Sequence, residues 1–164
     1  MKQAIIIENR KEHFDLVYDI LNNKSNFKDF FINVWPEKGD EKTIAAFRNF
    51  YLKFVIDPGD EINNSYITAN LPSSVDLFMI DFHLLSNPDK VDYLGGILRK
   101  KLIKQYFPNA KVIFLSRYDR TFLEPFMEEG DVYFDKTPPV STISKLDYWK
   151  QNIIHYLKAF FPNG

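Results

Sequence analysis

Val75-Asp76-Leu77-Phe78-Met79-Ile80-Asp81 is an apolar run that ends in an acid, and it sets the fold prediction. Short runs of this kind, bounded by polar residues, are typical of buried strands in parallel sheets. Three more apolar runs each lead to polar residues: 4–7 to Glu8-Asn9, 112–115 to Ser116, and 132–134 to Lys136. Parallel strands of one sheet would gather these side chains at its carboxyl edge, where open α/β sheets place their ligand sites. An acid, a second carboxylate, a hydroxyl and a lysine there suit the transfer of a phosphoryl group onto Asp81.

The composition favours a single packed domain. The chain has 164 residues, and its 16 phenylalanines and 9 tyrosines argue for a core rather than disorder. The absence of cysteine removes disulfides, a thiol nucleophile and zinc–cysteine sites, and it favours a reducing, cytoplasmic location. The formal net charge is −1, so no general attraction to nucleic acid or anionic lipid is expected. The apolar runs are too short for a signal peptide or a membrane span.

Helical patterns lie between the apolar runs, and this alternation predicts a parallel sheet with helices on both faces. The expected strands are 3–7, 30–34, 75–80, 111–115 and 131–135. The first helix repeats apolar residues with a 3.6-residue period, at Phe14, Val17 and Leu21, and its expected N-cap is Asn9. The last helix has Ser141 as its expected N-cap. Its expected apolar stripe is Ile143, Leu146, Ile153 and Leu157.

Two stretches are longer than the connections of such a fold. The excess is placed at 55–74 and 82–95, which are predicted as insertions into one domain that spans 1–164. Residues 65–68 are predicted as a short extra strand. The helix after the second insertion is expected to start at Asn87-Pro88 or at Gly96. A helical segment at 120–129 is expected to be kinked by Pro125, with Gly130 just past its end.

These residues, in this order, resemble the receiver domain of two-component response regulators. In that family an acidic pair ends the first strand, the phospho-accepting aspartate the third, a Ser or Thr the fourth, and a lysine the fifth. A switch aromatic three residues before the lysine falls here on Tyr133. The resemblance covers nearly the whole chain. It implies a flavodoxin-like, doubly wound, five-stranded parallel sheet with strand order 2-1-3-4-5 and helices on both faces.

The resemblance also implies an acceptor and a metal site. Asp81 is the expected phospho-acceptor. Glu8, Asn9, Asp81 and the backbone carbonyl of His83 are the expected ligands of a magnesium ion, which prefers oxygen ligands and keeps several waters. Lys136 is expected to place its charge against the phosphoryl oxygens.

A switch is implied in the same way. Ser116 is expected to donate its hydroxyl hydrogen to the new phosphate and to move toward it. Tyr133 is expected to fill the space that Ser116 leaves, which passes a local charge event to the surface of the molecule.

The expected function is therefore two-component signalling by a stand-alone receiver, with at most slow self-phosphorylation and self-dephosphorylation as enzymatic activity. The expected phosphodonor is a histidine kinase or a phosphotransfer protein. No output module follows the last helix, so output is expected through a downstream protein target. A homodimer is a further expectation, through the face formed by segment 120–129, the fifth strand and the last helix. Neither nucleic acid nor a membrane is an expected partner.

Three features depart from the family pattern and leave an alternative open. Asn9 replaces the second acid of the pair, which lowers the expected affinity for magnesium. Thr137 separates Lys136 from Pro138, so no cis peptide is expected after the lysine. The insertion at 82–95 lies directly after Asp81. The alternative is a pseudo-receiver, a protein-interaction module that works without phosphate.

Other functions find less support in the residues. Phosphatases of the haloacid-dehalogenase type need Asp-x-Asp, but this chain has Asp81-Phe82-His83, which lacks the general acid. Neither a Gly-x-Gly-x-x-Gly motif after the first strand nor a Walker loop is present. His13 and His155 show no metal-binding spacing with His83, and all three are predicted to be structural or exposed. The basic run at 99–101 is predicted to be a solvated face.

Overall fold

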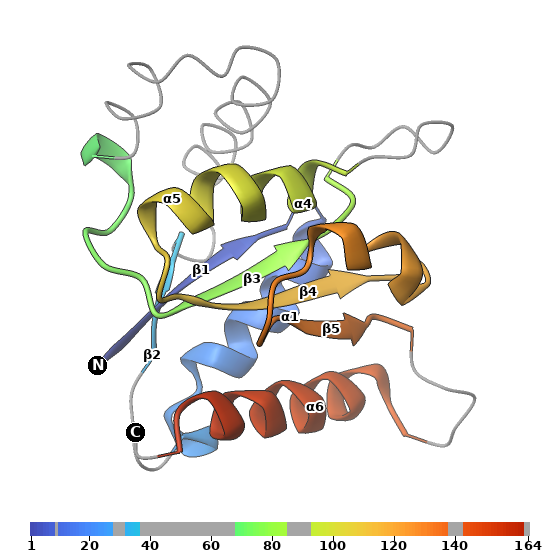
Figure 1. Cartoon of the computed structure of the whole chain (residues 1–164). Helices are drawn as coiled ribbons and strands as arrows, with labels where there is room; N and C mark the ends of the chain where they lie inside the picture. The colour runs from blue at the N-terminus through green and yellow to red at the C-terminus, as the bar shows by residue number, and fades with distance from the viewer. Residues whose placement is uncertain (9, 28–31, 37–67, 85–92, 138–142, 163–164) are drawn as a thin grey trace.

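Five parallel strands form the centre of the molecule (Figure 1). The computed structural model describes residues 1–8, 10–27, 32–36, 68–84, 93–137 and 143–162. The sheet order is β2-β1-β3-β4-β5, which confirms the predicted fold class and strand order. The strands are β1 (Lys2–Ile7), β2 (Ile32–Trp35), β3 (Leu77–Asp81), β4 (Lys111–Ser116) and β5 (Val132–Asp135).

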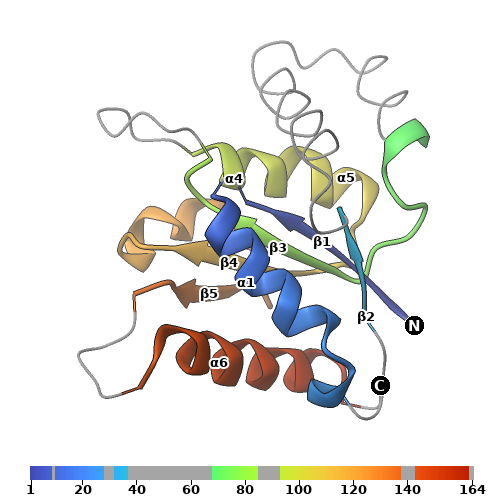
Figure 2. The ribbon, with the colours of Figure 1, turned by 180° about the vertical axis from the view of Figure 1, so that it is seen from behind.

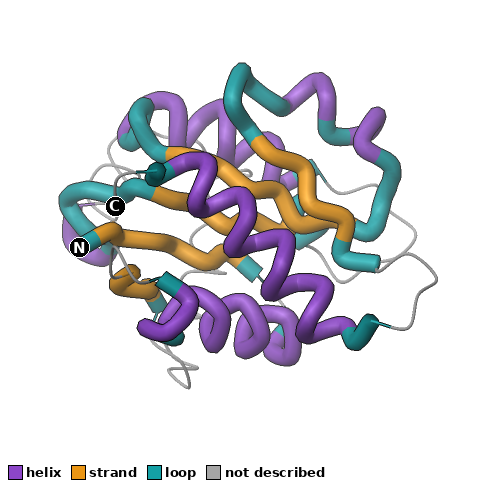
Figure 3. Tube along the Cα trace, turned by 90° about the horizontal axis from the view of Figure 1, so that it is seen from below, coloured by secondary structure: helices purple, strands orange, loops and turns teal. Residues whose placement is uncertain are grey.

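Helices cover both faces of the sheet. On one face lie α1 (Lys11–Asn22) and α6 (Lys145–Phe160), which Figures 2 and 3 show beside each other. On the other face lies one helical stretch, composed of α4 (Leu94–Leu98), a π-helical turn (Arg99–Ile103) and α5 (Lys104–Tyr106). This stretch ends at Tyr106, with Phe107 as its C-cap, because proline at 108 cannot continue a helix. No described helix combines the length and the apolar character that crossing a membrane requires.

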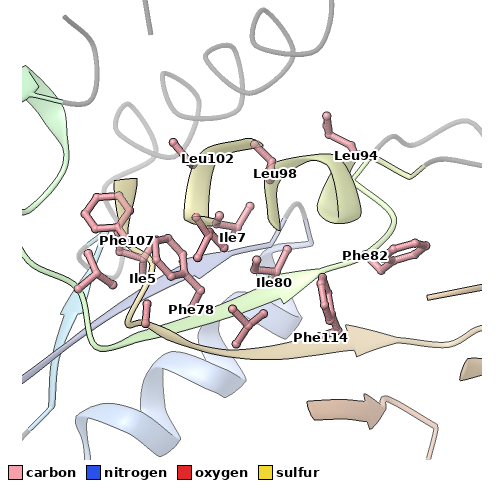
Figure 4. Close-up of a cluster of buried hydrophobic side chains, with 14 of the residues drawn as sticks. Ile5, Ile7, Phe78, Ile80, Phe82, Leu94, Leu98, Leu102, Phe107 and Phe114 are labelled. Carbon is pink, nitrogen blue, oxygen red and sulfur yellow. The ribbon is translucent and has the colours of Figure 1, made fainter. Parts of the chain in front are cut away.

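Alternate strand residues contribute their side chains to two separate hydrophobic cores, because successive side chains of a strand point to opposite faces of the sheet. The α4–α5 core joins helix residues Leu94, Leu98, Leu102 and Phe107 to strand residues Ile5, Ile7, Phe78, Ile80 and Phe114 (Figure 4). The α1–α6 core joins helix residues Phe14, Val17, Trp149, Ile153 and Leu157 to strand residues Ala4, Ile6, Leu77, Met79, Leu115 and Phe134.

The same alternation sorts the polar residues at the carboxyl edge into two groups. Glu8, Asp81 and Lys136 each lie two residues after a strand residue of the α1–α6 core. Ser116 lies two residues after a member of the α4–α5 core, and Tyr133 packs against that core. We call the first group the charged half and the second the hydroxyl half of the edge. Each half is therefore built against different helices.

The predicted start of the last helix is wrong. Ser144 is the N-cap of α6, and its hydroxyl accepts a hydrogen bond from the N–H of Asp147 at 3.1 Å. Ser141 lies outside the described residues. Because α6 begins later than predicted, Ile143 precedes it, and Leu146 falls in its first turn with 51% of its surface exposed. The buried stripe contains only the later apolar positions, and Trp149 belongs to it.

The segment at 120–129 contains no α-helix. It forms two 3₁₀ turns, Arg120–Phe122 and Glu124–Phe126, and Pro125 lies in the second. Proline has no N–H to continue a hydrogen-bonded helix, so the predicted interruption is confirmed. Gly130 does adopt a positive φ of 87°, but no helix precedes it, so its predicted role as a helix C′ residue is wrong.

The helix after the second insertion starts at Leu94, two residues before Gly96, which was one of the two predicted starts; the other, Asn87-Pro88, lies outside the described residues. Its N-terminus packs directly on the chain that leaves β3: the N–H of Gly95 donates to the carbonyl of Phe82 at 3.2 Å. A Cβ at position 95 would lie 2.6 Å from the carbonyl oxygen of Asp81. Only glycine fits this close approach of a helix to a strand end.

Several predicted elements fall outside the described residues: residues 30–31 of the second strand and most of both insertions. Thr68 is described, and it is helical rather than part of an extra strand. The basic run at 99–101 is only partly solvated, because Arg99 is buried and pairs with Asp131 at 2.8 and 3.0 Å. This ion pair fastens the π-helical turn to the start of β5. Within the described residues the one cis peptide precedes Pro36, so the bond after Lys136 is trans, as expected.

Candidate functional site

Three charged side chains from three strands meet at the carboxyl edge of the sheet. Glu8 follows β1, Asp81 ends β3 and Lys136 follows β5, and each is at most 5% exposed. Removing a charge from water is costly unless an opposite charge and hydrogen bonds compensate for it. The three groups therefore have to be considered as one ionic cluster.

The ammonium group of Lys136 joins the cluster. Its Nζ lies 2.8 Å from Glu8 Oε2 and 3.1 Å from Asp81 Oδ1. The main chain of Lys136 is fixed too, since its N–H donates to the carbonyl of Ser116 at 2.8 Å and its carbonyl accepts from Trp149 Nε1 at 3.1 Å. The structure thus brings together the acid, the second carboxylate and the lysine that the sequence placed at three strand ends.

Main-chain groups just after the strands also point at the carboxylates. The N–H of Arg10 donates to Glu8 Oε1 at 3.1 Å, and the N–H of His83 lies 3.3 Å from Asp81 Oδ1. Arg10 is the N-cap residue of α1, with no side-chain cap, so the prediction of Asn9 as N-cap is wrong. Asn9 itself lies outside the described residues. Each carboxylate is therefore oriented by the chain segment that follows it.

The hydroxyl half is linked through Tyr118, a residue that sequence reasoning missed. Ser116 is 1% exposed, and its Oγ accepts a hydrogen bond from the N–H of Tyr118 at 3.0 Å. The hydroxyl of Tyr133 donates to the carbonyl of Tyr118 at 2.6 Å. Burial and the charge of Asp135 raise the pKa of Tyr133, so this phenol keeps its proton and acts as a donor. The Tyr118 ring also lies 4.0 Å from the ring of His83.

His13 is a second residue that sequence reasoning did not assign to the site. It is fully buried, with Nδ1 3.3 Å from Lys136 Nζ and with Nε2 3.0 Å from Lys145 Nζ and 3.3 Å from Arg117 Nη2. Its ring lies 5.2 Å from that of Trp149. The sequence does contain one signal for it, because His13 is on the buried face of α1 at the end nearest Glu8.

No model of a known protein family matches the chain, and none of the curated proteins does. Among solved structures, the phosphorylated cyanobacterial phytochrome response regulator RcpA matches with a TM-score of 0.53, over 98% of this chain and 94% of that chain. The chain has the fold of a response regulator receiver domain. The sequence identity to RcpA is 18%, so the likeness concerns the fold, and the roles of the site residues have to be argued from their geometry.

The electrostatics of the receiver-like site are dominated by burial. Burial, and then the charge of Glu8, raise the pKa of Asp81 to about 8, although Lys136 acts in the opposite direction. Burial, and after it the nearby positive charges of Lys136, Lys145 and Arg117, lower the pKa of His13 to about 3. His13 is thus a neutral imidazole beside a cluster of two carboxyl groups and one ammonium group.

The donor set fits the magnesium ion that the receiver fold implies. Glu8 and Asp81 offer carboxyl oxygens, and when Asp81 loses its proton the two negative charges exceed the one positive charge of Lys136, an excess that a hard divalent cation would offset. The described part of the chain has no group of three or more His, Asp or Glu side chains that could hold a metal. Magnesium would therefore need waters and main-chain oxygens, such as the carbonyl of His83, to complete its shell.

Proposed function

We propose that this chain is a two-component receiver that accepts a phosphoryl group on Asp81 and signals through protein contacts. The donor would be a histidine kinase or a phosphotransfer protein in the cytoplasm, and the target would be another protein. The molecule would be a signalling domain rather than an enzyme that turns over a metabolite. The match to a solved structure of a phosphorylated response regulator supports this proposal.

One observation carries the proposal: the Lys136 ammonium lies 3.1 Å from Asp81 Oδ1, within a buried cluster that also contains Glu8. Phosphoryl transfer depends mainly on positioning and on compensation of the charge on the phosphoryl oxygens. A lysine next to the acceptor carboxylate supplies a compact positive charge for this purpose. Residues 81 and 136 are distant in the sequence, so their meeting depends on the whole sheet.

The proposed transfer is a displacement at phosphorus. An Asp81 oxygen forms the new bond to phosphorus, while the bond from phosphorus to the donor breaks and its electron pair leaves with the donor. Lys136 would turn from Asp81 to a phosphoryl oxygen, and the hydroxyl of Ser116 would donate to another. Magnesium, held by Glu8, Asp81 and the His83 carbonyl, would neutralise part of the phosphoryl charge; Asn9 is its further expected ligand.

The switch would follow from the hydrogen bonds of Tyr118. When Ser116 turns to the phosphoryl group, the N–H of Tyr118 loses its 3.0 Å acceptor. The carbonyl of the same residue holds the hydroxyl of Tyr133, so a shift of Tyr118 would also release or move the switch aromatic. The change would reach the surface near the 3₁₀ turns and β5. A homodimer through these turns, β5 and α6 remains part of the proposal.

Exposure to acetyl phosphate and magnesium tests the proposal. Intact-mass measurement should find one added phosphoryl group on the wild type, with none on Asp81→Asn. Asp135→Asn is the matched control, because Asp135 also ends a strand at this edge but lies outside the ionic cluster. It should be modified as fast as the wild type. Equal modification of Asp81→Asn would refute Asp81 as the acceptor.

The second candidate function is a pseudo-receiver that binds proteins without phosphate. It is favoured by the contacts of Lys136, which already joins both carboxylates and so occupies the space between them. This candidate predicts no modification by acetyl phosphate and no change of amide NMR shifts on adding magnesium with beryllofluoride, a phosphoryl mimic. Partner binding would then be the same for the wild type and Asp81→Asn.

A further inference from the structure

His13 is placed between the ionic cluster and two surface cations. It comes from the first turn of α1, is fully buried, and lies within hydrogen-bond distance of Lys136 on one side and of Lys145 and Arg117 on the other. Lys145 and Arg117 are exposed, whereas Lys136 is 4% exposed. The two ring nitrogens therefore face ammonium or guanidinium groups in very different surroundings.

The Lys136 ammonium group has three polar neighbours in the structure, two as hydrogen-bond partners and one as an ion-pair partner. Glu8 Oε2 is at 2.8 Å, Asp81 Oδ1 at 3.1 Å and His13 Nδ1 at 3.3 Å. An ammonium group has three donors and no acceptor, and each donor left unpaired in a buried site costs free energy. Without His13, one N–H of the Lys136 ammonium would lose its acceptor.

The distances around Nδ1 favour its role as an acceptor. His13 Nδ1 and Glu8 Oε2 are 3.9 Å apart, which is too long for an N–H···O hydrogen bond between them. The separation fits two acceptors, His13 Nδ1 and Glu8 Oε2, that both accept hydrogen bonds from the Lys136 ammonium group. A Nδ1–H proton would instead point at Glu8 or Lys136 without a hydrogen bond of normal length.

Lys145 favours the other tautomer of His13, in which Nε2 is the acceptor, because its Nζ lies 3.0 Å from Nε2 and could donate a hydrogen bond to that nitrogen. A neutral imidazole has only one acceptor nitrogen. Lys145 is exposed and can donate to water at little cost, whereas the buried Lys136 cannot. The proton of His13 then belongs on Nε2, where the exposed carboxylate of Glu12 lies 3.4 Å away.

We propose that His13 is a positioning residue for Lys136: its Nδ1 accepts a hydrogen bond from the ammonium group and holds Nζ beside Glu8 and Asp81. This role deepens the proposed phosphoryl transfer, because Lys136 must stay directed at Asp81 before the phosphoryl group arrives. His13 touches neither Asp81 nor the phosphoryl group in this scheme and acts only through Lys136.

The imidazole tautomer tests this inference without any phosphorylation. Long-range proton–nitrogen NMR of the folded wild type at neutral pH should show Nδ1 unprotonated and Nε2 protonated. The Lys136 ammonium should give a slowly exchanging NH₃⁺ signal. A Nδ1–H tautomer, with Nε2 accepting from Lys145, would overturn the inference. This measurement needs no variant, so it does not depend on whether a substitution folds.

Two substitutions of similar size separate positioning from space filling. His13→Asn keeps an acceptor near the place of Nδ1, whereas His13→Leu removes it. The Leu variant should lose the Lys136 ammonium signal and take up phosphoryl groups from acetyl phosphate roughly tenfold more slowly, the loss expected from one charge-assisted hydrogen bond. The Asn variant should keep the signal and react within about threefold of the wild type.

The outcomes distinguish this inference from the proposed function. Equal ammonium signals in both variants would show that His13 only fills space. If the wild type takes up no phosphoryl group, the proposed function fails, but the tautomer and the ammonium signal still decide the role of His13. His155→Leu, a change on α6 away from the cluster, is the control and should alter neither readout.

Discussion

The charged half and the hydroxyl half of the carboxyl edge differ in how they are held. In the charged half, the side chains of Glu8, Asp81 and Lys136 contact one another directly and are nearly inaccessible to solvent. In the hydroxyl half, the side chains of Ser116 and Tyr133 both bond to the main chain of Tyr118, a residue that is 48% exposed. The charged half is therefore rigid by electrostatics, whereas the hydroxyl half depends on single hydrogen bonds that can be exchanged. This difference suits a switch in which the hydrogen bonds of Tyr118 rearrange while Asp81 and its charged neighbours stay in place.

Replacement of Lys136 by methionine should have the largest effect on stability. The change leaves two buried carboxyl groups without their cation, and breaking a buried ion pair costs about 3–5 kcal/mol. Urea unfolding at pH 7 should show a loss of this size. Lys145→Met, at an exposed position, should stay within about 0.5 kcal/mol of the wild type. A loss below about 1 kcal/mol for Lys136→Met would mean that the charged half is no more rigid than the hydroxyl half.

Asp81→Asn should stabilise the protein, and the gain should depend on pH. The pKa of Asp81 is about 8 in the folded protein and 3.8 in its ordinary state, so the folded state binds this proton more tightly than the unfolded state. Stability contributed by the protonated carboxyl group is present below about pH 4 and is lost as the pH rises toward 8. Asparagine has no carboxyl proton to lose, so the variant keeps its stability as the pH rises, and its side-chain oxygen can still lie next to the Lys136 ammonium group.

The gain from Asp81→Asn should therefore grow between pH 4 and pH 8, by at most about 1.4 kcal/mol per pH unit. Urea unfolding of both proteins across this range measures it. Asp135→Asn provides the baseline, because it removes an aspartate at the same edge but outside the cluster. A gain that is constant with pH would contradict the assignment of the raised pKa to Asp81.

Ser116→Ala should cost about 1 kcal/mol, because the part-buried N–H of Tyr118 loses its acceptor. The same change should stop the response to magnesium and beryllofluoride from reaching Tyr133, as followed by amide NMR shifts. Ser144→Ala is the matched control: loss of the α6 N-cap should cost a similar ~1 kcal/mol and leave the response at Tyr133 intact. If Tyr133 still responds in Ser116→Ala, the connection through Tyr118 is not the route.

Tyr133→Phe should have the smallest effect, about 0.5–1.5 kcal/mol, since it removes one hydrogen bond to the carbonyl of Tyr118. Amide hydrogen exchange should become faster in the 3₁₀ turns that follow Tyr118. Tyr148→Phe removes a comparable hydrogen bond, to the carbonyl of Asp135, and should leave exchange in those turns unchanged. Exchange rates that are equal in the two variants would show that Tyr133 does not support Tyr118.

Much of the fold was predictable because its signals are local. An apolar run marks each strand, and alternation with helical patterns implies a parallel sheet, so Asp81 and Lys136 could be placed at one edge before any contact was known. Helix ends were less predictable, because Ser141 and Ser144 are both good N-caps by residue type and only the folded chain selects Ser144. The start of α4 at Leu94 matches neither predicted start that can be compared, since Gly96 lies two residues later, and the close packing of Gly95 on Asp81 that accompanies this start depends on the folded chain.

The sequence by itself determined the strands, their alternation with helices, and the polar residues at the strand ends. Only the tertiary structure decided that His13 and Trp149 complete the charged half and that Tyr118 links the hydroxyl half. The contact of His13 with Lys136 joins residues 123 positions apart. Strand and helix periods depend on neighbouring residues along the chain, whereas such contacts depend on sheet order, strand register and the packing of α1 and α6 on one face.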